Sequence, residues 1–169
     1  AIVSQPSHPW TAGASHLYTL EFMRQARAHL NDDVVLVQWM NVTFLDEALL
    51  RSLAATLLEA FGEVRLYRPD PNTLVFLASA RPLNVEIDVA ASGRPLNYSP
   101  DHYSRLGINS VEDLFAALAV DGEGMRALAN GAPLITDDDN RMATSSLYDF
   151  GQGLDPAGMG RLLARYDPL

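Results

Sequence analysis

The pattern of apolar and polar positions in the first part of the chain predicts a strand, a loop, a helix and a second strand. Residues 1–4 form a short apolar run, and the prolines and glycine of residues 5–13 indicate an irregular loop. Apolar residues then recur every four positions over residues 15–31, which predicts a helix with one buried face. The nearly continuous apolar run of residues 34–40 is typical of a strand that is buried on both faces of a parallel sheet.

A second helix and two strands follow. A leucine-rich stripe predicts a helix over residues 46–61, with Gly62 at the position that commonly ends a helix. Residues 63–68 and 73–80 have the composition of strands, and the proline-containing connection between them is too short for a crossover helix. These two strands must be antiparallel. The order of elements therefore predicts an α/β fold whose mostly parallel sheet ends in one reversed strand.

The composition of the sequence changes after residue 83. Residues 84–169 are more polar and are interrupted by glycine and proline, which predicts a small helical and loop extension packed on the α/β unit of residues 1–83. Ser110 and Asp113 have the spacing of a capping box at a helix start. The predicted features of the extension are helices over residues 111–119, 124–129 and 156–166, and an acidic turn at residues 136–140.

Composition and charge narrow the class of protein. The chain has 169 residues, of which 48% are hydrophobic and 20% charged, as expected for one globular domain. A net charge of −9 without a basic stripe argues against a nucleic-acid partner. The absence of cysteine excludes disulfides, thiolate nucleophiles and cysteine zinc sites. No apolar run approaches the length of a membrane helix and no signal peptide is present, so we expect a cytoplasmic segment without membrane contact.

Several motifs in these elements match one known family. They are residues 2–10 (IVSQPSHPW), residues 14–19 with Glu21 and Phe22, residues 37–39 (VQW) and residues 136–138 (TDD). Together they resemble the spermidine/spermine synthase, or polyamine aminopropyltransferase, family. They look most like the branch whose members are often fused to membrane-spanning segments or helical repeats. The resemblance implies the C-terminal half of a Rossmann-like domain of the kind that AdoMet-dependent methyltransferases use.

The part of the family domain that holds the aminopropyl donor has no counterpart here. Such enzymes use a glycine-rich loop and an acidic residue from their first half, and no GxGxG sequence occurs in these 169 residues. The chain also begins on a strand without methionine, so we expect a fragment that holds no cofactor and is inactive alone. The complete form would use decarboxylated S-adenosylmethionine or S-adenosylmethionine. An unpaired edge of the half sheet predicts a homodimer or strand exchange.

The resemblance also implies an acceptor site in the loop after the first strand. The family loop resembles Asp-Ser-Ser-Asp-Pro, in which a carboxylate takes a proton from the amine and holds the cationic polyamine. Alignment on Pro9 places Gln5 and His8 at the two catalytic carboxylate positions. An amide cannot accept that proton at physiological pH, whereas an imidazole can. The expected ligand is a small amine or polyamine, and the expected substrate-binding residues are Ser4, Ser7, Trp10, Asp137 and Asp138.

Other interpretations of these residues stay open. Gln5, His8 and Trp10 also suit a rigid turn with a packed tryptophan, in a degenerate transferase-fold module that serves ligand binding or protein interaction. Residues 137–139 can contact a cation, hold a hard metal ion, or form a solvated turn that caps a helix.

The remaining histidines and serines carry weaker signals. His16 and His29 fit surface or packing positions on the first helix, and His102 between Tyr98 and Tyr103 fits either a pocket or a packed loop. No Gly-x-Ser-x-Gly elbow surrounds any serine, which argues against a serine hydrolase.

Overall fold

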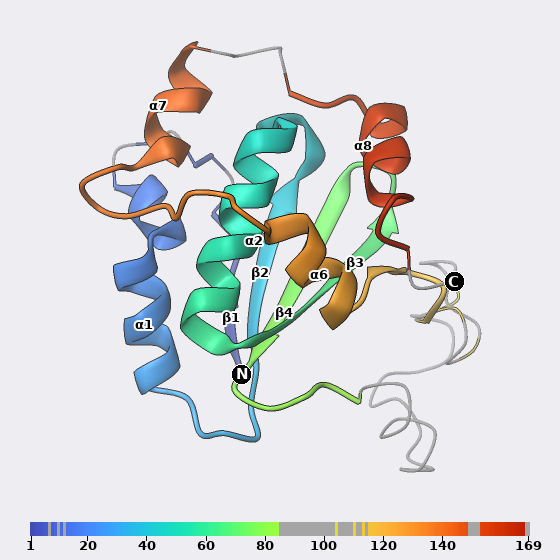
Figure 1. Ribbon diagram of the computed structural model, residues 1–169, viewed down its shortest axis with the longest axis horizontal. Coiled ribbons are helices and arrows are strands. Elements are labelled where there is room, and N and C mark those ends of the chain that lie inside the picture. Colours follow the sequence, from blue (N-terminus) through green and yellow to red (C-terminus); the bar gives the residue numbers. More distant parts are fainter. Residues whose placement is uncertain are drawn as a thin grey trace.

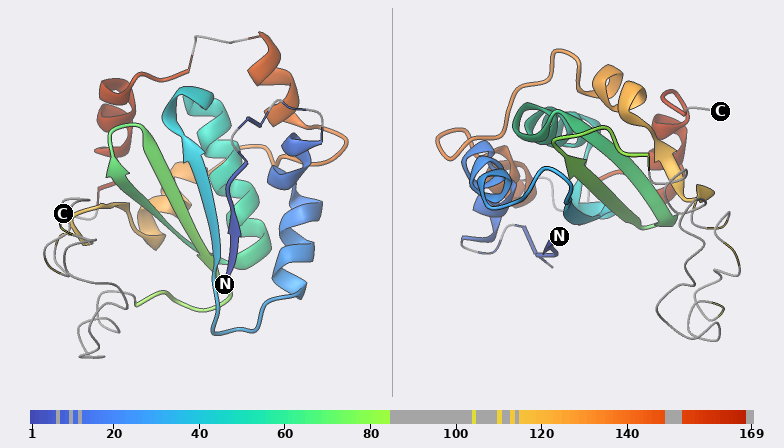
Figure 2. Two further views of the ribbon diagram at one scale, coloured as in Figure 1. Left: turned by 180° about the vertical axis from the view of Figure 1, so that it is seen from behind. Right: turned by 90° about the horizontal axis from the view of Figure 1, so that it is seen from below.

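A computed structural model describes residues 1–6, 8, 9, 11, 13–84, 104, 110, 113, 115–148 and 153–167. These residues form an α/β fold with a five-stranded mixed sheet, and helices α2 and α6 cover one face of that sheet (Figures 1 and 2). The elements are β1 (Ile2–Ser4), η1 (Ala14–Tyr18), α1 (Leu20–Ala28), β2 (Leu36–Asn41), η2 (Val42–Phe44), α2 (Glu47–Phe61), β3 (Glu63–Asp70), β4 (Thr73–Ser79), β5 (Leu118–Val120), α6 (Gly122–Ala129), α7 (Arg141–Tyr148) and α8 (Pro156–Leu163).

The sheet has the strand order β1-β2-β4-β3-β5. The pairing of β1 with β2 is parallel, and the β2–β4, β4–β3 and β3–β5 pairings are antiparallel. The prediction that β3 and β4 are antiparallel is therefore confirmed. The expectation of a mostly parallel sheet ending in one reversed strand is wrong for the described strands. Strand β3 leaves a gap beside β2, and the tight turn after Asp70 lets β4 fold back into that gap, so the reversed strand is internal.

The predicted helix over residues 46–61 is confirmed as α2, including both of its ends. The Asp46 side chain accepts a hydrogen bond from the Leu49 amide at 2.7 Å, which caps the helix start. Gly62 has a φ of 85°, a left-handed conformation that ends the helix without a Cβ penalty. The first predicted helix instead divides into η1 and α1. Thr19 lies between them in an extended conformation and its hydroxyl donates to the His16 carbonyl at 2.9 Å.

The extension contributes to the sheet as well as to the helical layer. Strand β5 pairs along the outer edge of β3, with Val120 opposite Leu66. The sequence pattern placed a helix across this strand, and of that helix only Asp113 and Phe115 are described as helical. A three-residue strand is too short to show a period of its own. The predicted contact at the helix start is present, since the Asp113 carboxylate accepts from the Ser110 amide at 2.9 Å.

The predicted helices at 124–129 and 156–166 are confirmed as α6 and α8 with shifted ends, whereas α7 was not predicted. All of these segments pack into a single hydrophobic core with α2 and the covered face of the sheet. The core residues that come from beyond residue 84 include Val120, Met125, Leu128, Ile135, Met142, Met159 and Leu162. No helix in the described part of the chain is both long and apolar enough to cross a membrane.

The second face of the sheet differs from the expectation for β2. Leu36 and Met40 point into the core and are fully buried, but the intervening Val37 and Trp39 are only half-buried. Strand β2 is therefore not buried on both faces, because the helices that follow β1 and β2 pack on the same side. Within the described residues β1 pairs only with β2, and Val3 on this edge is 66% exposed. The homodimer through this edge stays a prediction.

A buried hydroxyl gives a test of how the extension is held to α2. Thr56 donates to the Ser52 carbonyl at 2.7 Å and accepts from the Ile135 amide at 2.9 Å. We expect Thr56→Val to lower the free energy of unfolding by about 1–3 kcal/mol, because it leaves a buried N–H without an acceptor. Urea denaturation measures this loss. In the control variant Thr43→Val, which removes an exposed hydroxyl, the change should stay within about 0.5 kcal/mol. Equal effects of the two substitutions would contradict the assignment.

Candidate functional site

The candidate site lies at the carboxyl ends of the parallel pair β1 and β2. Open α/β sheets form their ligand crevices at this edge, because the loops that leave parallel strands gather there. Strand β1 ends at Ser4, whose register partner Gln38 is the third of the six residues of β2. The loop that carries Gln5 and His8 follows directly.

Two polar side chains at this position are buried and incompletely bonded. Gln38 is fully buried and its amide nitrogen donates to the Ser4 carbonyl at 3.3 Å and to the Trp39 carbonyl at 3.1 Å. Among the residues that the structure describes, its oxygen, Gln38 Oε1, has no hydrogen-bond partner, and neither does the buried hydroxyl oxygen of Ser4. Buried oxygens without a donor cost about 1–3 kcal/mol each, so they require an explanation. A ligand that carries hydrogen-bond donors would satisfy both.

Gln38 belongs to the motif of residues 37–39, but no role in the site was predicted for it from the sequence. It lies within the apolar run of residues 34–40, where the surrounding valine, leucine and tryptophan suggest packing alone. The available signal was its isolation, since a lone amide in an otherwise apolar buried strand must find partners inside the protein. Ser4, in contrast, was predicted, and its position at the end of β1 brings it next to Gln38.

The predicted catalytic positions lie in the loop that begins after Ser4. Gln5 and His8 are both exposed, and the His8 carbonyl accepts from the Thr11 amide at 3.1 Å in a turn of this loop. Ser7 and Trp10 lie outside the described residues, as do His102, Tyr98 and Tyr103. The assignment of catalytic and substrate-binding roles to these residues stays a prediction.

Tyr18 connects η1 to the loop after β1. Its ring is fully buried and its hydroxyl donates to the Pro6 carbonyl at 3.5 Å. Burial raises the pKa of the Tyr18 hydroxyl, because the phenolate would lose its hydration. Tyr18 therefore stays protonated at physiological pH and acts as a structural donor rather than as a base.

The structure brings the acidic turn against the start of α1. The Leu20 amide donates to the Ile135 carbonyl at 2.8 Å, and Figures 1 and 2 show this segment beside the first turn of α1. Asp137 then contacts two residues of this region. Its carboxylate lies 2.9 Å from His16 Nδ1, and its amide donates to Glu21 Oε2 at 3.0 Å.

These contacts change the acidity of Asp137. The hydrogen bond from the His16 side chain lowers the pKa of the Asp137 carboxyl, since it stabilises the ionised form. His16 is 57% exposed, as expected for a surface residue, but it is also the partner of Asp137. Sequence reasoning could not find this pair because 121 residues separate its members.

The other residues of the acidic turn are either exposed or bonded near the start of α7. Asp138 is exposed. The Asp139 carboxylate accepts from Arg141 Nε at 3.0 Å, and the Asn140 side chain accepts from the Ala143 amide at 3.1 Å at the start of α7. The capping interpretation therefore applies to the end of the turn. Among the described residues, no group of three histidine, aspartate or glutamate side chains could hold a metal ion.

The residues that the structure describes do not form a cradle for an AdoMet-type donor. Such a cradle needs glycines between a parallel strand and the helix that follows it. The described glycines with positive φ are Gly62 and Gly131, which follow α2 and α6, and Gly13, which precedes the short 3-10 helix η1. We therefore derive no catalytic step through that cofactor.

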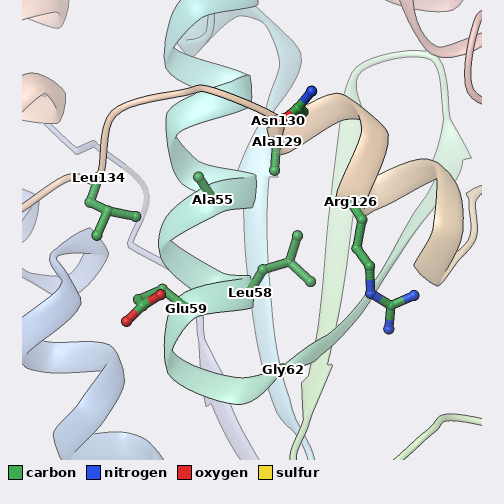
Figure 3. A pocket seen from close by; sticks show the side chains of 8 residues that line it. All are labelled: Ala55, Leu58, Glu59, Gly62, Arg126, Ala129, Asn130 and Leu134. Carbon is green, nitrogen blue, oxygen red and sulfur yellow. The ribbon is translucent and has the colours of Figure 1, made fainter.

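A shallow depression of about 380 Å³ lies between α2 and α6 rather than at the ends of β1 and β2 (Figure 3). Leu58 and other apolar residues form much of its lining. The Arg126 guanidinium is bonded to Glu63 at 2.6 Å, and the Glu59 carboxylate to Arg24 at 3.3 Å. The two charged side chains that line the depression thus have protein partners.

Comparison with known proteins does not identify a family. No protein-family model matches this chain. No curated protein matches it either.

The unpartnered hydroxyl of Ser4 can be tested against the well-bonded hydroxyl of Thr56. We expect Ser4→Ala to leave the free energy of unfolding unchanged or to raise it by up to about 1 kcal/mol, because it removes a buried group that has no partner. Urea denaturation beside Thr56→Val makes the comparison. A loss similar to that of Thr56→Val would mean that the Ser4 hydroxyl is bonded in solution.

The contact between Asp137 and His16 predicts a dependence of stability on pH. A carboxyl whose pKa is lowered on folding stabilises the fold above its unfolded pKa of about 3.9, and this contribution disappears as the pH falls through the lowered value. The stability difference between the wild type and Asp137→Asn should therefore be larger at pH 6 than at pH 2.5. Asp138→Asn removes the same charge without removing the contact, and should show a smaller difference at pH 6. Indistinguishable profiles for the two variants would contradict this assignment.

Proposed function

We propose that this chain binds a small amine or polyamine at the carboxyl ends of β1 and β2, as the acceptor-side half of a spermidine-synthase-like α/β domain. The observation that carries the proposal is the pair of buried oxygens, Gln38 Oε1 and Ser4 Oγ, that have no donor. An ammonium group has only donors to offer, so it is complementary to such a pair. Gln5 and His8 are exposed in the loop that follows Ser4.

Charge supports a cationic ligand. The chain carries a net charge of −9, and the turn that contains Asp137 and Asp138 packs against the start of α1. The lowered pKa of Asp137 keeps its carboxylate ionised over the whole physiological range. Long-range attraction toward such a surface increases the encounter rate of a small cation.

The directions of the strands support the resemblance to a transferase half-domain. Strands β1, β2 and β3 run in the same direction, β4 runs against them between β2 and β3, and β5 runs against them at the edge. A parallel unit with one antiparallel hairpin is what the resemblance implies. The finer assignment, a Rossmann-like domain of the methyltransferase type, is part of this proposal.

Binding, rather than aminopropyl transfer, is the function we assign to the chain itself. Gln5 is a neutral amide at the position where the family has a carboxylate, and the chain lacks the glycine-rich donor loop. Transfer is the second candidate, for a domain in which other residues supply the site for an AdoMet-type donor. The imidazole of His8, exposed in the acceptor loop, favours this candidate because it can accept a proton.

Calorimetric titration with spermidine tests the proposal. We expect saturable binding by the wild type. Gln38→Leu should bind spermidine at least about tenfold more weakly, since a hydrogen bond to a charged group contributes about 1.5–3 kcal/mol. Gln5→Asp should bind more tightly because it restores a carboxylate. Gln25→Leu replaces an exposed amide on α1 and serves as the control, with unchanged affinity expected.

The outcomes separate the candidates. No heat from spermidine at millimolar concentration, or equal binding by Gln38→Leu and the wild type, would contradict amine binding at this position. An assay with decarboxylated S-adenosylmethionine and spermidine addresses transfer. We expect no product from the wild-type chain, and product formation would favour the enzyme candidate instead.

A further inference from the structure

We propose that His16 and Asp137 form a histidine–aspartate dyad that accepts an ammonium group of the bound amine at His16 Nε2. This inference rests on the proposed amine binding, and it adds a contact between two residues that the sequence motifs contain separately and do not pair. The pair is formed by η1 and the turn before α7, two segments that meet only in the folded chain.

The geometry of the pair leaves one imidazole nitrogen available. His16 Nδ1 lies 2.9 Å from Asp137 Oδ1, and an ionised carboxylate can only accept, so the proton of the neutral imidazole is on Nδ1. Nε2 is then the acceptor, on a side chain that is 57% exposed. The same arrangement of carboxylate and imidazole selects the tautomer of a general base in hydrolases.

Asp137 is itself held in place. Its amide donates to Glu21 Oε2 at 3.0 Å, and the Ile135 carbonyl, two residues earlier, accepts from the Leu20 amide at 2.8 Å. An acceptor whose backbone is held in this way restricts the ring of its partner more than a carboxylate on an unanchored surface turn would. The dyad is therefore a more ordered site than the exposure of its members suggests.

The position of the dyad relates it to the acceptor loop. His16 and Tyr18 belong to the same short helix, η1, and the Tyr18 hydroxyl contacts the Pro6 carbonyl directly after Gln5. The segment that carries Asp137 is tied to the start of α1 by the bond from Leu20 to Ile135. A polyamine is long and flexible, and it can place one ammonium near Gln38 and another at the dyad.

The chemistry of the dyad follows from its protonation state. An ammonium N–H donates to Nε2, and when the proton transfers, the N–H bond breaks and an Nε2–H bond forms. The amine nitrogen keeps the electron pair and becomes neutral. The positive charge moves to the imidazole, where the Asp137 carboxylate stabilises it. A proton acceptor of this kind compensates for the neutral amide of Gln5.

Binding at the dyad should depend on pH. A protonated His16 would repel an ammonium, and its Nε2 could no longer accept from it. The charged or titratable groups on the elements packed around the pair are Glu21 on α1, Asp138 and Asp139 on the turn, Arg141 at the start of α7, and His8 in the acceptor loop. Carboxylates stay largely ionised at pH 5, so the experiment must distinguish the contributions of the individual histidines.

The test is spermidine calorimetry at pH 8 and pH 5 with three matched variants. We expect the wild type to bind about tenfold more tightly at pH 8, which is the factor that about 1.4 kcal/mol of repulsion provides. His16→Gln keeps a donor for Asp137 but removes the imidazole acceptor, so it should lose most of this dependence. His29→Gln is the control, because His29 Nδ1 lies 2.8 Å from the Gln25 carbonyl and has no carboxylate partner there. His8→Gln shows whether the loop histidine is responsible.

The outcomes distinguish this inference from the proposed function. Absence of spermidine binding at both pH values contradicts the proposed function and the dyad together. Binding whose pH dependence survives in His16→Gln, or disappears only in His8→Gln, overturns the dyad and leaves amine binding intact. Long-range nitrogen-proton NMR gives a readout without any ligand. We expect the Nδ1–H tautomer of His16, and its replacement by the Nε2–H tautomer would also overturn the dyad.

Discussion

The burial of helix α2 against the sheet is the interaction on which the rest of the structure depends. Its leucines, among them Leu50, Leu53 and Leu57, are fully buried and form the centre of the single core. Helices α1 and α6 pack on either side of α2 (Figure 1), so the helical layer exists because this stripe must be covered. Each buried leucine contributes about 1.5–3 kcal/mol, which outweighs the small propensities of the individual elements.

The same helix organises the candidate site although it contributes no functional side chain to it. Thr56 on α2 holds the Ile135 amide, and the Ile135 carbonyl holds the start of α1. Asp137 follows two residues later and meets His16. A turn near the end of the chain thus reaches a loop near its beginning through a buried connection, and that connection explains how exposed residues can keep a definite geometry.

The site itself is a polar defect in an otherwise apolar region. Within the described part of the chain, Gln38 Oε1 and Ser4 Oγ have no donor, although Leu36 and Met40, the neighbours of Gln38 on the same face of β2, are apolar. Retaining such groups reduces stability, and proteins commonly accept that cost at places where a ligand binds. A donor-only ligand such as an ammonium resolves the defect, which is the physical basis of the proposed amine binding.

The sequence by itself determined most elements and their local ends. The apolar periods, the Asp46 cap and Gly62 predicted α2, and the short proline turn predicted the β3–β4 hairpin, because these signals act between residues close in the chain. Only the tertiary structure decided that β4 inserts beside β2, that β5 extends the sheet, and that β2 is half-covered. Those outcomes depend on which sheet edge a strand joins and which sheet face the helices cover. The local spacing of apolar residues does not contain that information.

The candidate site divides in the same way. The loop after β1 and the acidic turn were recognisable as motifs, since their residues are adjacent in sequence. The unbonded oxygen of Gln38 and the pairing of His16 with Asp137 were not, because both arise from contacts between distant segments. A sequence states which chemical groups are present. Packing of the core determines which of those groups meet and which lose their partners.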